Sequence, residues 1–151
     1  MDLAFKKEVF AACRQWLTER VDSLEEEIEQ TRLAASEETK SSMGDKYETG
    51  RAMLHLTRER LESQLAEAQR LYNAISKLEP TTSHGKAQLG SLVATDRGLF
   101  YLSVGIGKIN VDNQAIFCIS TSAPLGRVLM GRNTNESFTF QEKPLLIKAV
   151  V

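Results

Sequence analysis

The chain has 151 residues, of which 42% are hydrophobic and 26% charged, and its formal net charge is −1. A chain of this length can bury a core as one ordinary domain or as two small ones. The charge is uneven, because residues 1–79 hold 16 acidic and 12 basic side chains whereas residues 80–151 hold 4 and 7. Proteins that bind duplex DNA usually carry a strong basic patch, so this distribution argues against that class.

The first residues, MDLAFKKEVFAAC, mix charged and apolar side chains too closely for the apolar core of a signal peptide. No apolar run approaches the length that crosses a bilayer, so we expect no membrane partner and a cytoplasmic location. The two cysteines, Cys13 and Cys118, lie in a helical and a strand pattern, without a C-x-x-C motif. We therefore expect buried free thiols, and neither a zinc site nor a redox motif.

Two long helical patterns fill the first half of the chain, from Asp2 to about Lys40 and from Lys46 to Leu78, and neither contains proline. Each has a heptad-like apolar stripe. The stripes are Leu17, Val21, Leu24, Ile28, Thr31, Ala35 and Leu54, Leu61, Leu65, Ala68, Tyr72, Ile75. Because only a few residues separate the helices, we expect an antiparallel coiled-coil hairpin over 1–79, with its tip at 41–48. The stripe also leaves a weak homodimer open.

A linker is expected at 80–86, PTTSHGK, which collects proline, glycine and small polar residues. After it, the pattern changes to the alternation that is typical of strands. One hairpin is predicted around the turn Asp96-Arg97-Gly98, and a later turn at Gln141–Pro144. The expected strands are 89–95, 99–104, 114–120, 137–140 and 145–151.

A single short helix is predicted within this second part. Ser122 would cap it, Pro124 would stand in its first turn, and Gly131 would end it. Residues 87–151 should then form a small, mostly antiparallel sheet domain with one helix, which makes the whole fold α+β.

Other apparent motifs support no chemistry. Gly105-Ile106-Gly107-Lys108 suggests a phosphate loop, but Leu102 stands where its first glycine is needed and Ile109 where Ser or Thr is needed, so these are turn glycines. His84 is expected to be exposed and without a structural role. His55 lies off the apolar stripe and has no second histidine one turn away, so it is expected to be a surface or packing residue.

Asp45 and Glu48 stand three residues apart at the start of the second helix. Aspartate at the N-cap and glutamate at N3 would form a capping box, which satisfies backbone N–H groups and suits the helix dipole. Two carboxylates at a tip can also offer hard oxygen ligands to Mg²⁺, whose other ligands would come from another molecule. Both interpretations stay open. Exposed acids have no walls that exclude water, so any chemistry there would happen inside a partner.

Two segments together carry a family resemblance. Gly44, Asp45 and Glu48 match the motif Gly-Asp-x-x-Glu-Asn-x-x-Tyr, with Thr49 and Ala52 in place of its Asn and Tyr. The second motif is Ile-Ser-x-[Asn/Asp]-Ser-Pro-x-x-Arg-x-Leu-x-Gly-Lys. It is matched by Ile119, Ser120, Pro124, Arg127, Leu129 and Gly131, and altered at Ser122, Ala123 and Arg132. In this order and on this architecture, the chain resembles the bacterial Gre transcript-cleavage factors, GreA and GreB.

The resemblance implies an FKBP-like fold for the sheet domain and binding in the secondary channel of RNA polymerase. There, the factor would stimulate Mg²⁺-dependent cleavage at the 3′ end of a backtracked RNA. Asp45 and Glu48 would be the catalytic acids and metal ligands, with the Mg²⁺ site completed in trans by polymerase. Ser122, Pro124 and Arg127 would contact polymerase. The protein would thus be an accessory factor and not itself an enzyme, and it would bind no Mg²⁺ when free.

Alternatives remain beside this expectation. A regulator of the same build could occupy the channel without cleavage, because Thr49 and Ala52 depart from the motif. A coiled-coil adaptor unrelated to polymerase would need the acids only as helix caps, and a helix start explains Ser122 and Pro124 equally well. Prolyl isomerase activity would rest on fold analogy alone.

Overall fold

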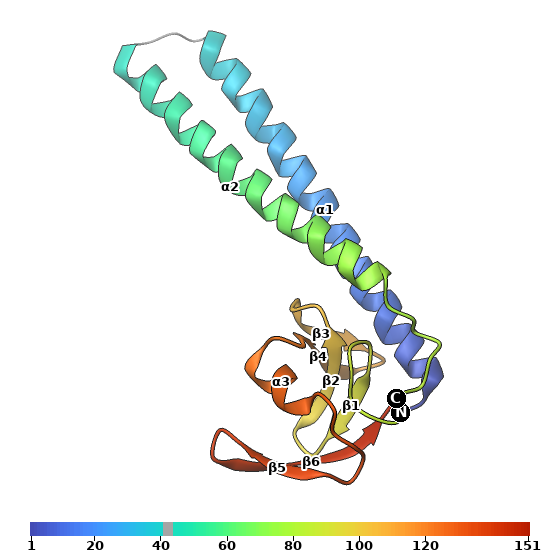
Figure 1. The fold of residues 1–151 in the computed structure, drawn as a ribbon. Coiled ribbons are helices and arrows are strands. Elements are labelled where there is room, and N and C mark those ends of the chain that lie inside the picture. The colour runs from blue at the N-terminus through green and yellow to red at the C-terminus, as the bar shows by residue number, and fades with distance from the viewer. Residues whose placement is uncertain (41–43) are drawn as a thin grey trace. The chain divides into compact units, whose positions relative to one another are not determined.

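The computed structural model describes residues 1–40 and 44–151, and the side chains of 1–37 and 48–151. These residues form helix α1 (Leu3–Lys40), helix α2 (Gly44–Ser76), six strands and the short helix α3 (Pro124–Leu129) (Figure 1). The predicted α+β class is confirmed, with the helical hairpin first and the sheet and single short helix after it. Over the described part of the chain, no helix combines the length and the apolar character that crossing a bilayer requires.

Contacts divide the chain into two compact units. One unit is Trp16–Tyr72, and the other joins Met1–Gln15 to Asn73–Val151. The first turns of α1 belong with the second half of the chain because they contact it, as in the hydrogen bond from Lys6 Nζ to Thr82 O at 2.6 Å. The domain bounds expected from the sequence, 1–79, 80–86 and 87–151, follow the secondary structure and stay a prediction.

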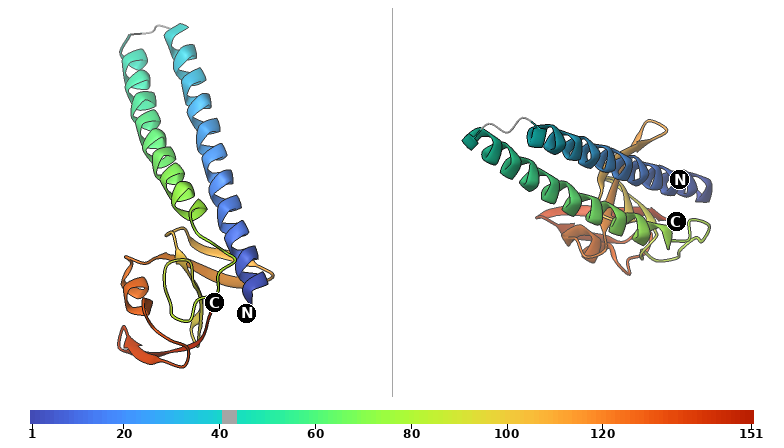
Figure 2. Two further views of the ribbon diagram at one scale, coloured as in Figure 1. Left: turned by 45° about the vertical axis from the view of Figure 1, so that its right-hand side comes forward. Right: turned by 90° about the horizontal axis from the view of Figure 1, so that it is seen from above.

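The unit Trp16–Tyr72 is a hairpin in which α1 and α2 run side by side in both views of Figure 2. Its core uses members of both predicted stripes, namely Val21, Leu24, Ile28, Leu61, Leu65 and Ala68. At the edge of this core, Arg20 Nη2 donates to Gln64 Oε1 over 3.4 Å. Further along α1, Thr31 and Ala35 lie beside Leu54, which comes earlier in α2 than Gln64. The predicted antiparallel pairing is therefore confirmed.

The other unit contains one six-stranded sheet with the order β3-β4-β2-β1-β6-β5 among the described residues. Its strands are β1 (Leu92–Thr95), β2 (Gly98–Ser103), β3 (Gly107–Val111), β4 (Gln114–Ser120), β5 (Ser137–Phe140) and β6 (Lys143–Val150). The β2–β4 pair is parallel and the other pairs are antiparallel. The predicted β1–β2 hairpin is confirmed, and Gly98 has the positive φ, 129°, that its turn requires.

Two features of the sheet differ from the expectation. Strand β3 is absent from the predicted elements, because the glycines Gly105 and Gly107 indicate turns. Asp112 and Asn113 have φ of 48° and 61°, so they make the two-residue turn that joins β3 to β4. Pro144 is predicted in a turn, but it pairs with Thr139 inside β6, because the turn is completed earlier.

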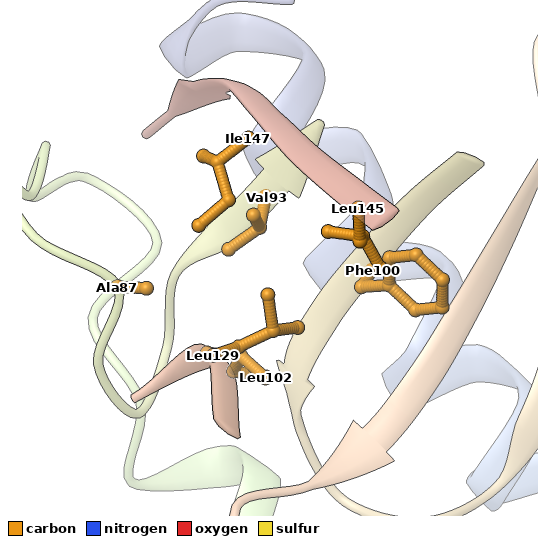
Figure 3. Close-up of a cluster of buried hydrophobic side chains, with 7 residues drawn as sticks. All are labelled: Ala87, Val93, Phe100, Leu102, Leu129, Leu145 and Ile147. Carbon is orange, nitrogen blue, oxygen red and sulfur yellow. The ribbon is translucent and has the colours of Figure 1, made fainter. Parts of the chain in front are cut away.

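The two faces of the sheet are buried by different elements. One face packs against α3 through a cluster of seven buried side chains (Figure 3). They are Ala87, Val93, Phe100, Leu102, Leu129, Leu145 and Ile147. Tyr101 alternates with its neighbours Phe100 and Leu102, so it points to the opposite face. Tyr101 is fully buried, as are Val9 and Cys13 of the first turns of α1, and Cys13 contacts strand β4.

Candidate functional site

Three residues expected to contact polymerase lie in the short helix α3 or directly before it. Pro124 occupies the first helical position, where its fixed φ suits the helix and its missing N–H costs nothing. Ser122 precedes it and Arg127 follows it, and all three side chains are exposed. We call the exposed residues Ser122, Pro124 and Arg127 the α3 start.

Buried contacts hold the α3 start in place. Gly126 is buried, and a Cβ atom added to it would lie 2.1 Å from the backbone oxygen of Ser120, at the end of β4. Only glycine permits this approach of helix to strand. One turn later, Leu129 is fully buried in the cluster of Figure 3. The sequence motif includes Leu129 but not Gly126. A glycine inside a short helix, where it costs propensity, is the signal that could have identified this contact.

Ser122 does not cap α3, contrary to the sequence-based expectation. The N-cap is Ala123, which makes no side-chain capping bond. The Ser122 hydroxyl instead lies 2.8 Å from the Ser120 hydroxyl, and the Ser122 backbone N–H donates to the same Ser120 Oγ at 3.2 Å. Because Ser120 O also accepts from Ala123 N at 3.0 Å, the end of β4 organises the helix start.

The segment after α3 is held within its own unit. Arg132 stands where the resembling motif has lysine, and its guanidinium carbon lies 4.5 Å from the centre of the Phe138 ring. Its Nε donates to Val128 O at 3.1 Å, and its Nη1 to Glu136 Oε1 at 3.4 Å. Glu136 also accepts from the backbone N–H of Asn133, and this bond is the main reason that the pKa of Glu136 lies below its usual value.

The predicted tip, 41–48, lies partly outside the described residues. Helix α2 begins at Gly44, so Asp45 lies within it and not at the N-cap that the capping box required; the Asp45 side chain lies outside the described part. Glu48 is exposed and lines a shallow, open depression with Arg51, Ala52 and His55. Its carboxylate is the kind of hard oxygen donor that Mg²⁺ prefers. Within the described residues, no three His, Cys, Asp or Glu side chains are grouped so as to hold a metal ion.

The histidines have different surroundings. His55 is exposed and its Nε2 lies 3.3 Å from Glu59 Oε1, which suits the predicted surface position. His84 was expected to be exposed and idle, and this was wrong. It is half-buried and its Nδ1 lies 2.7 Å from Ser91 Oγ, a fully buried hydroxyl. Burial, and next the charge of Lys6, lower the pKa of His84, so the neutral ring is favoured.

The two cysteines lie in contact, which was not expected from the sequence. Both are buried free thiols, as predicted, but their sulfurs lie only 3.2 Å apart. No redox motif is expected from the sequence, because Cys13 lies on a helix and Cys118 on a strand, 105 residues apart. Local sequence patterns carry no information on such a distant contact. The hydrogen bond with Cys118, and then burial, raise the pKa of the Cys13 thiol.

Comparison with known proteins gives one result of note. No protein-family model and no curated protein matches the chain. Among solved structures, it is similar to one described as the structure of the transcription factor Gfh1. The two share 18% sequence identity, the TM-score is 0.38, and the match covers 92% of this chain and 93% of that one.

Proposed function

We propose that the protein is a Gre-like transcription factor that binds RNA polymerase and stimulates Mg²⁺-dependent cleavage of backtracked transcripts. One observation carries the proposal. The motif residues within α3 separate into a buried anchor, Leu129, and exposed side chains, Pro124 and Arg127. Helix geometry accounts for Pro124 and core packing for Leu129, but neither requires an exposed arginine. A binding role accounts for Arg127 as well.

The acids of α2 would supply the chemistry. The Glu48 carboxylate is exposed, so a partner can reach it. With Asp45, it would provide two oxygen ligands for a Mg²⁺ ion, and polymerase would provide the rest. Mg²⁺ bound there would promote attack of water on the RNA phosphodiester. Asp45 and Glu48 would hold the ion and orient that water, so the factor would remain an accessory to the catalytic centre of polymerase.

A second candidate is a regulator that binds polymerase without cleavage. Thr49 and Ala52 favour it, because both are exposed beside Glu48 and Ala52 has no polar group with which to orient a neighbouring carboxylate. The two candidates share a binding surface and differ only at the tip.

The test uses a backtracked elongation complex assembled with RNA polymerase from the same source as the protein. Wild type with Mg²⁺ should release short 3′ RNA fragments, and Asp45→Asn and Glu48→Gln should each reduce the rate at least about tenfold. Glu26→Gln, which removes an exposed acid of α1, is the matched control and should behave as wild type.

Binding is measured separately by co-sedimentation with polymerase. Arg127→Ala should weaken binding, whereas Lys148→Ala, which removes an exposed cation from β6, should not. Binding without cleavage products selects the regulator. The absence of binding by the wild type rejects both candidates and leaves the coiled-coil adaptor. Equal cleavage by wild type and Asp45→Asn rejects the role of the acids.

A further inference from the structure

We propose that Cys13 and Cys118 are a redox-modification site, at which hydrogen peroxide converts the two thiols into an intramolecular disulfide. The pair joins the first turns of α1 to strand β4 within a single compact unit. It therefore operates without any contribution from residues 16–72 and independently of the proposed role in transcription.

The geometry of the pair favours bond formation. The sulfurs are 3.2 Å apart, and a disulfide needs about 2.05 Å, so an approach of roughly 1 Å is enough. Cys13 lies four positions after Val9 on the buried side of α1, and Cys118 lies between Phe117 and Ile119 in the middle of the sheet. Rotation of the two side chains can provide such an approach without breaking the helix or the β4 ladders.

A second observation at the same place points to an oxidised intermediate. Tyr101 is fully buried, and its hydroxyl has no hydrogen-bond partner among the residues that the structure describes. Tyr101 pairs with Cys118 in the parallel β2–β4 ladder, so the two side chains lie on the same face of the sheet. Burial, and next negative charge on Cys13 and Cys118, raise the pKa of Tyr101. The oxygen of a sulfenic acid on one sulfur would give this hydroxyl the acceptor that it lacks.

The chemistry balances in two steps. In the first, one sulfur attacks a peroxide oxygen, the O–O bond breaks, and the products are a sulfenic acid and water. In the second, the other sulfur attacks the sulfenic sulfur, the S–S bond forms, and the sulfenic oxygen leaves as water with the thiol proton. The two thiols lose two electrons in total, and hydrogen peroxide accepts them.

Burial of the two thiols limits the size of the oxidant that can reach them and slows the oxidation. The exposed fractions of Cys13 and Cys118 are 0% and 1%, which leaves no room for the mixed disulfide that a glutathione-sized reagent must form. Peroxide is little larger than water. The raised pKa of Cys13 keeps the reactive thiolate scarce, so the reaction should be slower than that of an exposed cysteine.

The test uses the folded, fully reduced protein, with intact mass, thiol titration and melting temperature as readouts. Exposure to hydrogen peroxide should remove the mass of two hydrogens and both titratable thiols, and peptide mapping should find Cys13 linked to Cys118. The closed loop spans about 100 residues, so the melting temperature should rise by about 10 °C and fall again on reduction.

Cys13→Ser and Cys118→Ser are the matched controls, and neither should show the loss of mass or the rise in melting temperature. The wild type by itself decides the outcome, so a variant that fails to fold leaves the test intact. The proposal is overturned if the native wild type keeps both thiols while peroxide oxidises them in the urea-unfolded chain. Oxygen added to unlinked cysteines, or a disulfide-linked dimer in place of the internal bond, overturns it equally.

Discussion

The two helix starts that carry the resemblance differ in how the protein holds them. At the α3 start, Gly126 lies against the end of β4 and Leu129 is buried in the core, so the exposed Arg127 has a fixed base. At the start of α2, Glu48 is exposed and shares an open depression with the side chains of its own helix. The chain thus fixes the α3 start through its own buried contacts, whatever that surface binds. The positions of its acids would be completed by a partner.

The largest change in the free energy of unfolding should come from adding a side chain where α3 touches the end of β4. In Gly126→Ala, the new Cβ would lie 2.1 Å from Ser120 O, so helix and strand must separate. We expect the free energy of unfolding to fall by about 3 kcal/mol, measured by urea denaturation. Gly105→Ala is the control, because its Cβ would meet no atom within 4 Å. A loss below about 1 kcal/mol for Gly126→Ala would show that α3 is not held tightly.

Replacing glycine by alanine near the start of α2 should raise the free energy of unfolding, which is the opposite of its effect in α3. Gly50 lies inside that helix, where alanine lowers the conformational entropy of the unfolded chain. Gly50→Ala should raise the free energy of unfolding by about 0.5 to 1 kcal/mol, in the same urea experiment. The reverse change at a nearby exposed position, Ala52→Gly, should lower it by a similar amount. Destabilisation by Gly50→Ala would indicate that α1 packs closely against this part of α2. The two helix starts would then differ less in how tightly they are packed.

The smallest change in stability should come from Glu136 in the loop that follows α3, and its size should depend on pH. The pKa of Glu136 is lowered in the folded state, so its contribution to stability is complete above the usual glutamate pKa of about 4.3 and is lost as the pH falls through the lower folded value. Glu136→Gln should therefore lower the melting temperature at pH 7, and the difference from wild type should shrink towards pH 3. Glu142→Gln removes the same charge from the β5–β6 turn and is the control. A difference that stays constant with pH would contradict this assignment.

Periodicity and turn chemistry predicted the elements whose causes are local. The two stripes indicated the buried faces of the hairpin, Gly98 marked the first β-turn, and Pro124 marked the first turn of α3. Strand β3 was missed because Asp112-Asn113 makes its turn without a glycine. Within the candidate site, the motif pointed to the residues of the α3 start, which are exposed, and their role in binding stays a prediction.

The remaining features depend on contacts between distant segments. Gly126 is needed because the chain has turned back on the end of β4, and the Cys13–Cys118 contact exists because α1 covers one face of the sheet. His84 gained a partner, Ser91, only when the residues before β1 folded back on themselves. The sequence shows these residue types but not which of them meet.

The parallel β2–β4 pair has a consequence for the order of folding. The β1–β2 and β3–β4 hairpins each close over a short loop, whereas their union requires β4 of one hairpin to pair with β2 of the other, with Ser120 aligned to Ser103. Local hairpins form faster than ladders between distant strands. Ser120 is also the residue on which α3 begins. The α3 start should therefore assemble only once the two hairpins have joined, and its presence reports that the β2–β4 ladder has formed.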